Sequence, residues 1–227
     1  MNHLKEDTMT GHRLPILITT AVLLAMSVTA ALALPRFARS TNLSCATCHV
    51  CVAGGADLND AGKAFKSDST KVPAASVEGA EFVSNKKCRT CHLTEYKSWQ
   101  ETPHAKSLEV LMTADSTKIA EMAKRAGVQL AGPPSQNEAC LSCHVTGYKL
   151  VGGYPAADSL KNAALAFVTC EACHGPGSKH VTAEKAVKKT FTNGHVSEVL
   201  CRGCHTPTMS PKFDFAAYKT KGVHAAK

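Results

Sequence analysis

An apolar run without charged residues occupies positions 14–34. Two basic residues, Lys5 and Arg13, precede it, and the small-x-small pattern Ala31-Leu32-Ala33 stands near its end. These features are typical of a signal peptide, which we predict over residues 1–33. The alternative is an uncleaved membrane anchor, because a run of this length can span a bilayer. Both interpretations place the rest of the chain outside the cytoplasm, in the periplasm or beyond the cell.

Helical rather than strand periodicity dominates the remaining sequence. The spacing of apolar residues predicts the longest helix over 104–126, preceded by Pro103 and ended by Gly127. Its apolar positions are Leu108, Leu111, Met112, Ile119, Met122 and Ala126. Residues 67–80, rich in Ser, Thr, Ala and Lys, predict a linker. No alternating run supports a sizeable sheet, so we expect a mainly α fold with long loops and little or no sheet.

Ten of the eleven cysteines fall into five C-x-x-C-H units. The units are Cys45-Cys48-His49, Cys88-Cys91-His92, Cys140-Cys143-His144, Cys170-Cys173-His174 and Cys201-Cys204-His205. This is the attachment signature of c-type haem. Two thiols at this spacing reach one edge of the haem to form thioethers, and the following His can ligate the iron. The sequence therefore predicts five covalent haems c.

Three other uses of paired cysteines fit less well. A zinc site takes a second Cys pair or a distant His pair and does not require His directly after the second Cys. A disulfide framework predicts an even number of cysteines without linked histidines. A thioredoxin-like motif would be single and set in a βαβ unit. The regular Cys-Cys-His grouping favours haem over all three.

Composition changes the expected core and charge. Aromatic residues make up only 5% of the chain, so a conventional core would be thin and the haems must supply the apolar centre. The formal net charge is +8, but five haems would add about ten propionate charges, partly offset by the ferric irons. We therefore expect no nucleic-acid binding. The clustered basic residues, which we expect to be solvated or to face propionates, are Lys86, Lys87, Arg89, Lys185, Lys188 and Lys189.

Four stretches resemble the tetrahaem cytochrome c-554 family. They read CRTCHLTEYKSWQETPHAKSLEVL, CLSCHVTGYKLVGGY, VTCEACHGPGSKH and CRGCHTPTMSPKFDFAAYKTKGVH, in this order from Cys88. The resemblance implies a mostly helical domain over 76–227, with closely stacked haems that transfer electrons outside the cytoplasm. The preceding PRFARSTNLSCATCHVCVAGGADLNDAGKAF is similar to single-haem segments of other multihaem cytochromes, which predicts a separate segment over 34–75.

Distal iron ligands are sought among the histidines outside the motifs. His3 and His12 fall in the predicted leader, which leaves His104, His180, His195 and His224. The resemblance implies ligand roles for His104, His180 and His224, and His195 is a fourth candidate. Four candidate histidines for five irons leave one iron without a distal histidine. Met112, Met122 or Met209, or a histidine of another chain, could fill that position.

The iron without a distal histidine bears on function. The resemblance implies an open site at the second tetrahaem motif, here Cys140-Cys143-His144, and His49 is the other candidate. Cys51, the odd cysteine, is either free or paired between chains. We predict an electron carrier rather than an enzyme, with other redox proteins or further copies of the chain as partners. The alternative is a reductase of a small nitrogen or sulfur compound at the open haem, for which His195 and Lys161 are the available polar groups.

Overall fold

The computed structural model describes residues 35–221 and 223–224. The predicted signal peptide and its cleavage pattern lie outside these residues. The described residues belong to one compact unit, and none of their helices is long and apolar enough to cross a membrane. The described part is helical, with a single isolated β-bridge between His49 and Leu58. The expectation of a mainly α fold without a sheet is therefore confirmed.

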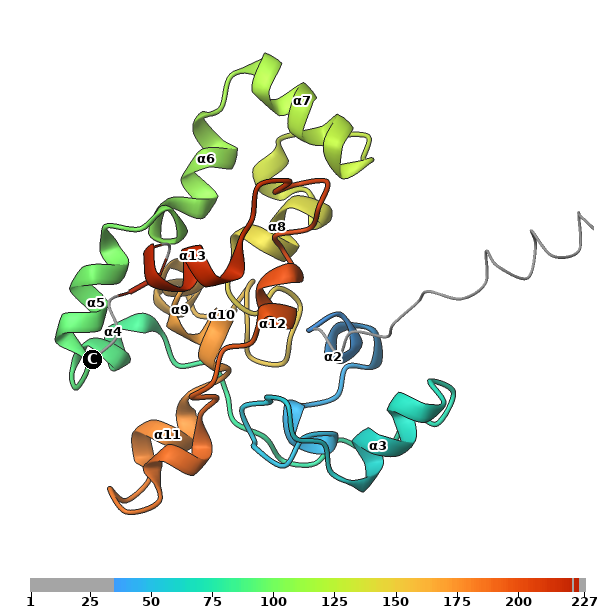
Figure 1. Ribbon diagram of the computed structural model, residues 1–227, viewed down its shortest axis with the longest axis vertical. Helices are drawn as coiled ribbons and strands as arrows, with labels where there is room; N and C mark the ends of the chain where they lie inside the picture. Colours follow the sequence, from blue (N-terminus) through green and yellow to red (C-terminus); the bar gives the residue numbers. More distant parts are fainter. Residues whose placement is uncertain (1–34, 222, 225–227) are drawn as a thin grey trace, which may run out of the picture. The chain divides into compact units, whose positions relative to one another are not determined.

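Short helices follow one another along the described chain (Figure 1). The α-helices are α2 Pro35–Thr41, α3 Asp60–Ser67, α4 Asn85–Arg89, α5 Leu93–Gln100, α6 Ser107–Thr113, α7 Ser116–Ala126, α8 Glu138–His144, α9 Ser159–Leu165, α10 Cys170–His174, α11 Ser178–Thr182, α12 Glu198–Arg202 and α13 Phe215–Lys221. The 3-10 helices are η1 Cys45–Thr47, η2 Pro103–Lys106, η3 Pro134–Gln136 and η4 Lys188–Phe191. No helix or strand occupies 68–84, which includes most of the predicted linker.

The predicted single helix over 104–126 is wrong in its continuity. It divides into η2, α6 and α7, and the break falls at Ala114, whose backbone is extended. Asp115 then caps α7, because its side chain accepts a hydrogen bond from the Lys118 N–H at 2.9 Å. The predicted end at Gly127 is confirmed, since this glycine adopts the left-handed conformation that closes many helices.

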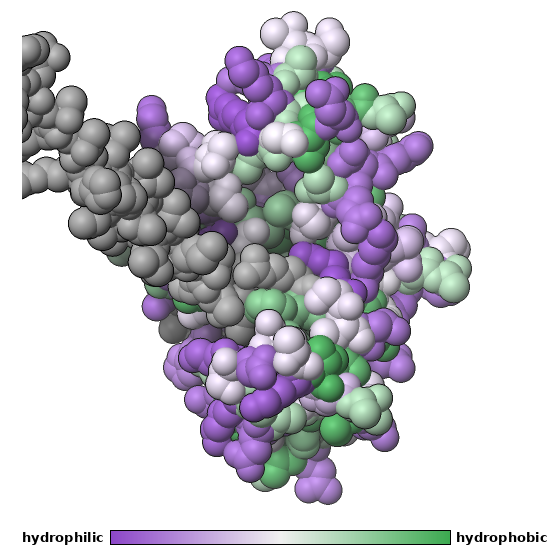
Figure 2. Space-filling view, turned by 90° about the vertical axis from the view of Figure 1, so that its right-hand side faces the viewer, coloured by the Kyte–Doolittle hydropathy of each residue, from purple (hydrophilic) through white to green (hydrophobic). Residues whose placement is uncertain are grey.

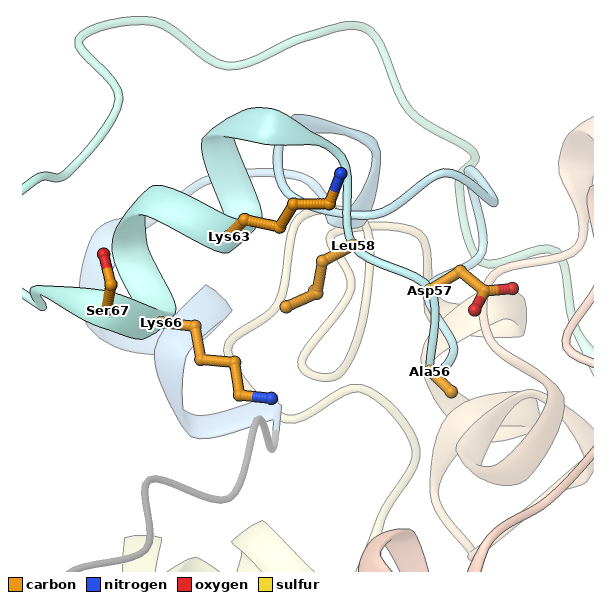
Figure 3. Close-up of a pocket in the computed structure, with 6 residues that line it drawn as sticks. All are labelled: Ala56, Asp57, Leu58, Lys63, Lys66 and Ser67. Atoms are coloured by element: carbon orange, nitrogen blue, oxygen red, sulfur yellow. The ribbon is translucent and has the colours of Figure 1, made fainter.

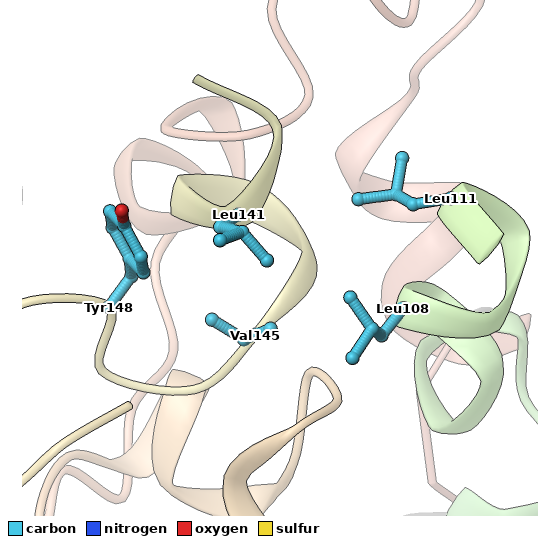
Figure 4. Close-up of a cluster of buried hydrophobic side chains, with 5 residues drawn as sticks. All are labelled: Leu108, Leu111, Leu141, Val145 and Tyr148. Carbon is cyan, nitrogen blue, oxygen red and sulfur yellow. The ribbon is translucent and has the colours of Figure 1, made fainter. Parts of the chain in front are cut away.

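The apolar core is thin, as the composition predicts. One cluster joins α6 to α8 and the loop after it (Figure 4). Its buried members are Leu108, Leu111, Leu141, Val145 and Tyr148. On the outside, hydrophilic and hydrophobic residues are mixed over one face (Figure 2). Little apolar protein surface is therefore packed against protein alone.

Leu165 offers a test of how much this small core contributes. Its side chain is fully buried, whereas Leu160 of the same helix α9 is 73% exposed. Leu165→Ala should lower the free energy of unfolding of the haem-loaded protein by about 2–5 kcal/mol, because it removes buried contacts and leaves a cavity. Leu160→Ala is the matched control and should change it little. Chemical denaturation measures both, and equal losses would contradict the assignment of Leu165 to the core.

Candidate haem-binding site

Each C-x-x-C-H unit forms about one helical turn. In the first, second and fifth units the histidine N–H donates to the carbonyl of the first cysteine at 2.9 Å. The third and fourth units lie within α8 and α10. Residues three and four apart lie on the same face of a helix, so both thiols and the imidazole project from one side. This is the arrangement that binding a single haem requires, and none of the eleven cysteines forms a disulfide.

Three motif histidines face a histidine from outside the motifs. The ring centres of His92 and His180 are 6.2 Å apart, with nearly parallel planes. His205 and His104 are separated by 6.0 Å, and His174 and His224 by 5.9 Å. All three spare histidines that the resemblance implies as ligands thus lie opposite a motif histidine, on segments distant in the sequence.

The separation of these rings matches two ligands on one iron. A metal–imidazole bond is about 2 Å and the ring nitrogen lies about 1.2 Å from the ring centre, so two axial imidazoles have centres roughly 6.4 Å apart. Direct stacking would bring aromatic rings closer, as for His205 and Phe213 at 4.5 Å. The gap between each pair of histidines therefore fits a metal ion better than ring-on-ring contact.

Hydrogen bonds at Nδ1 orient two rings of the facing pairs and the ring of His144. His144 Nδ1 lies 2.6 Å from the Ser107 carbonyl oxygen, and His174 Nδ1 lies 2.8 Å from that of Asn193. His180 Nδ1 is 2.9 Å from the Lys188 carbonyl oxygen. A carbonyl accepts only from a protonated Nδ1, so the hydrogen bond leaves the Nε2 lone pair available to a metal.

The pKa values of three motif histidines favour the neutral, ligating form. Burial lowers the pKa of His49, His174 and His205. For His174 the neighbouring His224, His92 and His180 lower the pKa further, against the Asn193 carbonyl. The two motif histidines His92 and His174 and their facing histidines thus lie close together, which indicates that the second and fourth sites are adjacent.

The cysteine thiols connect the motifs in an order different from the sequence. Cys88 of the second motif shares a side-chain hydrogen bond with Cys170 of the fourth, which raises the pKa of Cys88 and lowers that of Cys170. Cys204 of the fifth motif likewise shares a side-chain hydrogen bond with Cys143 of the third motif, which raises the pKa of Cys204. Cys201 interacts electrostatically with Cys173, whose pKa burial raises to about 12. The attachment sites therefore form a row in the order second, fourth, fifth, third.

The first motif meets this row at the fourth motif. The loop after His49 approaches the turn after His174, where a Cβ on Gly175 would lie 2.0 Å from the Ala53 carbonyl oxygen. Gly175 has a φ of +75°, so glycine suits both its conformation and the close approach. Cys51 contacts the same region, with its Sγ 3.5 Å from the Thr190 carbonyl oxygen.

A surface hollow lies beside the first motif (Figure 3). It measures about 570 Å³ and is lined by Ala56, Asp57, Leu58, Lys63, Lys66 and Ser67. Leu58 forms the β-bridge with His49, so the hollow adjoins the histidine of this motif. The His49 Nδ1 is buried and has no hydrogen-bond partner. Two lysines at the rim are suited to the carboxylates of a bound haem.

His144 and His195 are not paired in this way. Within the described residues no ring contact of either with another histidine is found, and no group of three or more His, Cys, Asp or Glu side chains is arranged as a metal-ion site. His195 is exposed, and its backbone N–H donates to Asn193 Oδ1 at 3.3 Å. The same Asn193 Oδ1 lies beside Gly55, at 3.7 Å from the position that a Cβ on this glycine would occupy. His195 therefore lies near the loop that follows the first motif.

Comparison with known proteins adds an independent observation. Residues 87–175 match the family model described as cytochrome c554 and c-prime. This match covers less than half of the chain, and it includes the second, third and fourth motifs. It is similar to cytochrome c-554 of Nitrosomonas europaea, with 39% identity over 142 residues that cover 56% of this chain and 58% of that protein. It is also similar to the reduced-state structure of that cytochrome, with a TM-score of 0.47 and 29% identity over 64% of this chain and 84% of the other.

The residues present at the five motifs fit c-type haem by their donor sets. Paired thiols, an adjacent imidazole and a facing histidine would supply two thioether bonds and two nitrogen ligands to a haem at three of the sites. The methionines fit less well. Met112 is 68% exposed, Met122 packs against the apolar cluster, and Met209 is half-buried.

Sequence reasoning missed three residues that position the motifs. Asn59 caps α3 and donates to the Ala46 and Thr47 carbonyls at 3.3 and 3.2 Å. Ser107 holds His144, since its hydroxyl donates to the His144 carbonyl at 2.9 Å. Glu171, between the two cysteines of the fourth motif, is only 4% exposed. Asn before a short helix is a recognisable cap signal, whereas nothing in the sequence marks the other two.

Proposed function

We propose that this chain binds five covalent haems c and carries electrons between redox partners outside the cytoplasm. The observation that carries the proposal is the set of three facing histidine pairs, His92–His180, His205–His104 and His174–His224. Two protein ligands on an iron leave no position for a substrate and need not change on reduction. Bound haem supplies the redox chemistry, and the protein fixes its ligands and spacing.

The row of thiols supports electron passage between haems. Each pair in it, Cys88–Cys170, Cys173–Cys201 and Cys204–Cys143, joins two motifs. Haems attached at these sites would be neighbours in the order second, fourth, fifth, third. The first haem, held over 34–75, would join at the fourth. We place His195 as the candidate partner of His49, on the basis of the Asn193 contact to Gly55.

Location and partners follow from the sequence. The apolar run over 14–34 with its small-x-small pattern supports export to the periplasm or beyond, with membrane attachment only if the run is retained. Other cytochromes or redox proteins are the proposed partners, and self-association into a haem array is a further one. No role with nucleic acid is proposed.

A second function rests on His144. Its Nδ1 bond to Ser107 prepares it as a ligand, but within the described chain no histidine ring faces it. An iron at this site would be open to a small nitrogen or sulfur compound. Reduction of such a compound would need a positioned acid or base as well. The electron carrier is the better supported function because most of the sites are closed.

Carbon monoxide separates the two functions. The reduced wild-type protein should bind carbon monoxide at no more than one of its haems, because the three facing pairs and the proposed His49–His195 pair block the other four. It should not turn over nitrite, hydroxylamine or sulfite. Spectrophotometric titration and steady-state assays measure both properties. Sustained reduction of any of the three compounds would replace the carrier by the reductase, with the iron at His144 as its site.

A further inference from the structure

A buried carboxylate lies between two neighbouring haem-attachment sites. Glu171 directly follows Cys170 of the fourth motif and is 4% exposed. Its carboxylate also reaches the segment that leads into the second motif, four residues before Cys88. This side chain therefore joins the two sites whose thiols, Cys88 and Cys170, share a hydrogen bond.

Every hydrogen bond to this carboxylate comes from a backbone N–H. Val83 N lies 2.9 Å from Oε1 and 3.1 Å from Oε2, Ser84 N is 2.9 Å from Oε2, and Gly177 N is 2.8 Å from Oε1. These donors all suit an ionised carboxylate, whereas the proton of a neutral acid would have no acceptor among them. The three donors thus hold a negative charge in place inside the protein.

The electrostatic reach of Glu171 extends to both attachment sites. Its charge raises the pKa of the Cys88 thiol and opposes the lowering of the pKa of Cys170. Burial raises the pKa of Glu171 itself, while the N–H donors and Lys161 oppose that change. Lys161 is thus near enough to act on this carboxylate electrostatically. In a buried setting such a charge acts more strongly than an exposed one, because water and salt screen it less.

We propose that Glu171 is a fixed negative charge that lowers the reduction potentials of the two haems attached at Cys88 and Cys170. A ferric haem carries one more positive charge than a ferrous haem, so a nearby carboxylate stabilises the oxidised form. Glu171 is a positioning and tuning residue rather than an iron ligand. This inference rests on the proposed function, since it requires haem at both motifs.

Glu171→Gln tests the charge with little change of shape. In this variant of the haem-loaded protein, the potentials of two haems should shift upward while those of the others stay within error. A spectroscopically monitored redox titration measures them. The two affected haems are assigned by their response to His180→Ala and His224→Ala, whose rings face His92 and His174. Glu138→Gln is the matched control, because that exposed carboxylate precedes the third motif and pairs with Lys149 at 2.6 Å.

Two further variants keep the test decisive. Glu171→Asp retains the charge and should return the potentials toward the wild-type values. Lys161→Gln removes the nearby cation and should shift the same two potentials downward. This variant provides the test if Glu171→Gln does not yield haem-loaded protein. Five haems with unchanged potentials in Glu171→Gln, or an upward shift in Lys161→Gln, would overturn the tuning role and leave the electron carrier intact. Failure of the wild-type chain to bind haem would instead overturn the proposed function.

Discussion

Replacement of His180 by alanine is expected to convert one low-spin iron of the haem-loaded protein to high spin. The ring of His180 lies 6.2 Å from that of His92, and its Nδ1 is fixed by the Lys188 carbonyl. Without this ring the iron at His92 would lose its sixth ligand, whereas both thioether bonds would remain. The same result is expected for His104→Ala and His224→Ala, each at a different haem.

Electron paramagnetic resonance and optical spectra measure the change. Haem content should not alter, and added imidazole should restore the low-spin signal by filling the vacated position. Carbon monoxide should bind one more haem in each variant than in the wild type. Lys106→Ala is a matched control, because this exposed residue lies two positions from His104. A variant with the wild-type low-spin spectrum would remove that histidine from the ligand set.

Loss of one complete haem is the second large effect, expected when Cys45 and Cys48 are both changed to serine. Thioether bonds need the two thiols, and the first motif offers no other pair at the required spacing before a histidine. Intact mass should fall from five haem additions to four. The domain over 76–227 should keep its haems, because its four motifs have their own attachment cysteines.

Cys51→Ser provides the control within the same segment. Cys51 stands three residues after Cys48, but valine rather than histidine follows it. The pKa of Cys45 is raised mainly by burial and to a smaller extent by the neighbouring Cys51. Cys51 therefore does not complete a Cys-x-x-Cys-His unit, and the variant should retain five haems. A loss of one haem on Cys51→Ser would show that Cys51, rather than Cys45 or Cys48, carries a thioether.

The attachment motifs could be predicted from the sequence because their chemistry is local. Cys, Cys and His at fixed spacing occupy one helical turn wherever they occur, so no tertiary contact is needed. The pairing of His180 with His92, or of His104 with His205, depends on how distant segments pack, and spacing alone does not contain it. Resemblance supplied the candidate histidines, and the structure placed a motif histidine opposite three of them.

The misjudged helix and the missed carboxylate have different causes. Apolar spacing continues across Ala114, so periodicity alone extended the helix, while the capping preference of Asp115 ended it locally. Glu171 stands in a position between two cysteines where an acidic residue would be expected to face water. Its burial follows from the docking of residues 83–84 and 177 around it, which only the fold reveals.

The interleaved order of the attachment sites has a consequence for biogenesis. The third motif neighbours the fifth through Cys143 and Cys204, and the ring facing His174 belongs to His224, which is synthesised much later in the chain. Haems attached early would stand without their final neighbours until the last segments arrive. If haems are attached as proposed, a chain that ends before residue 201 would expose apolar haem edges to proteases and to other chains. Covering these edges would then depend on the C-terminal segments.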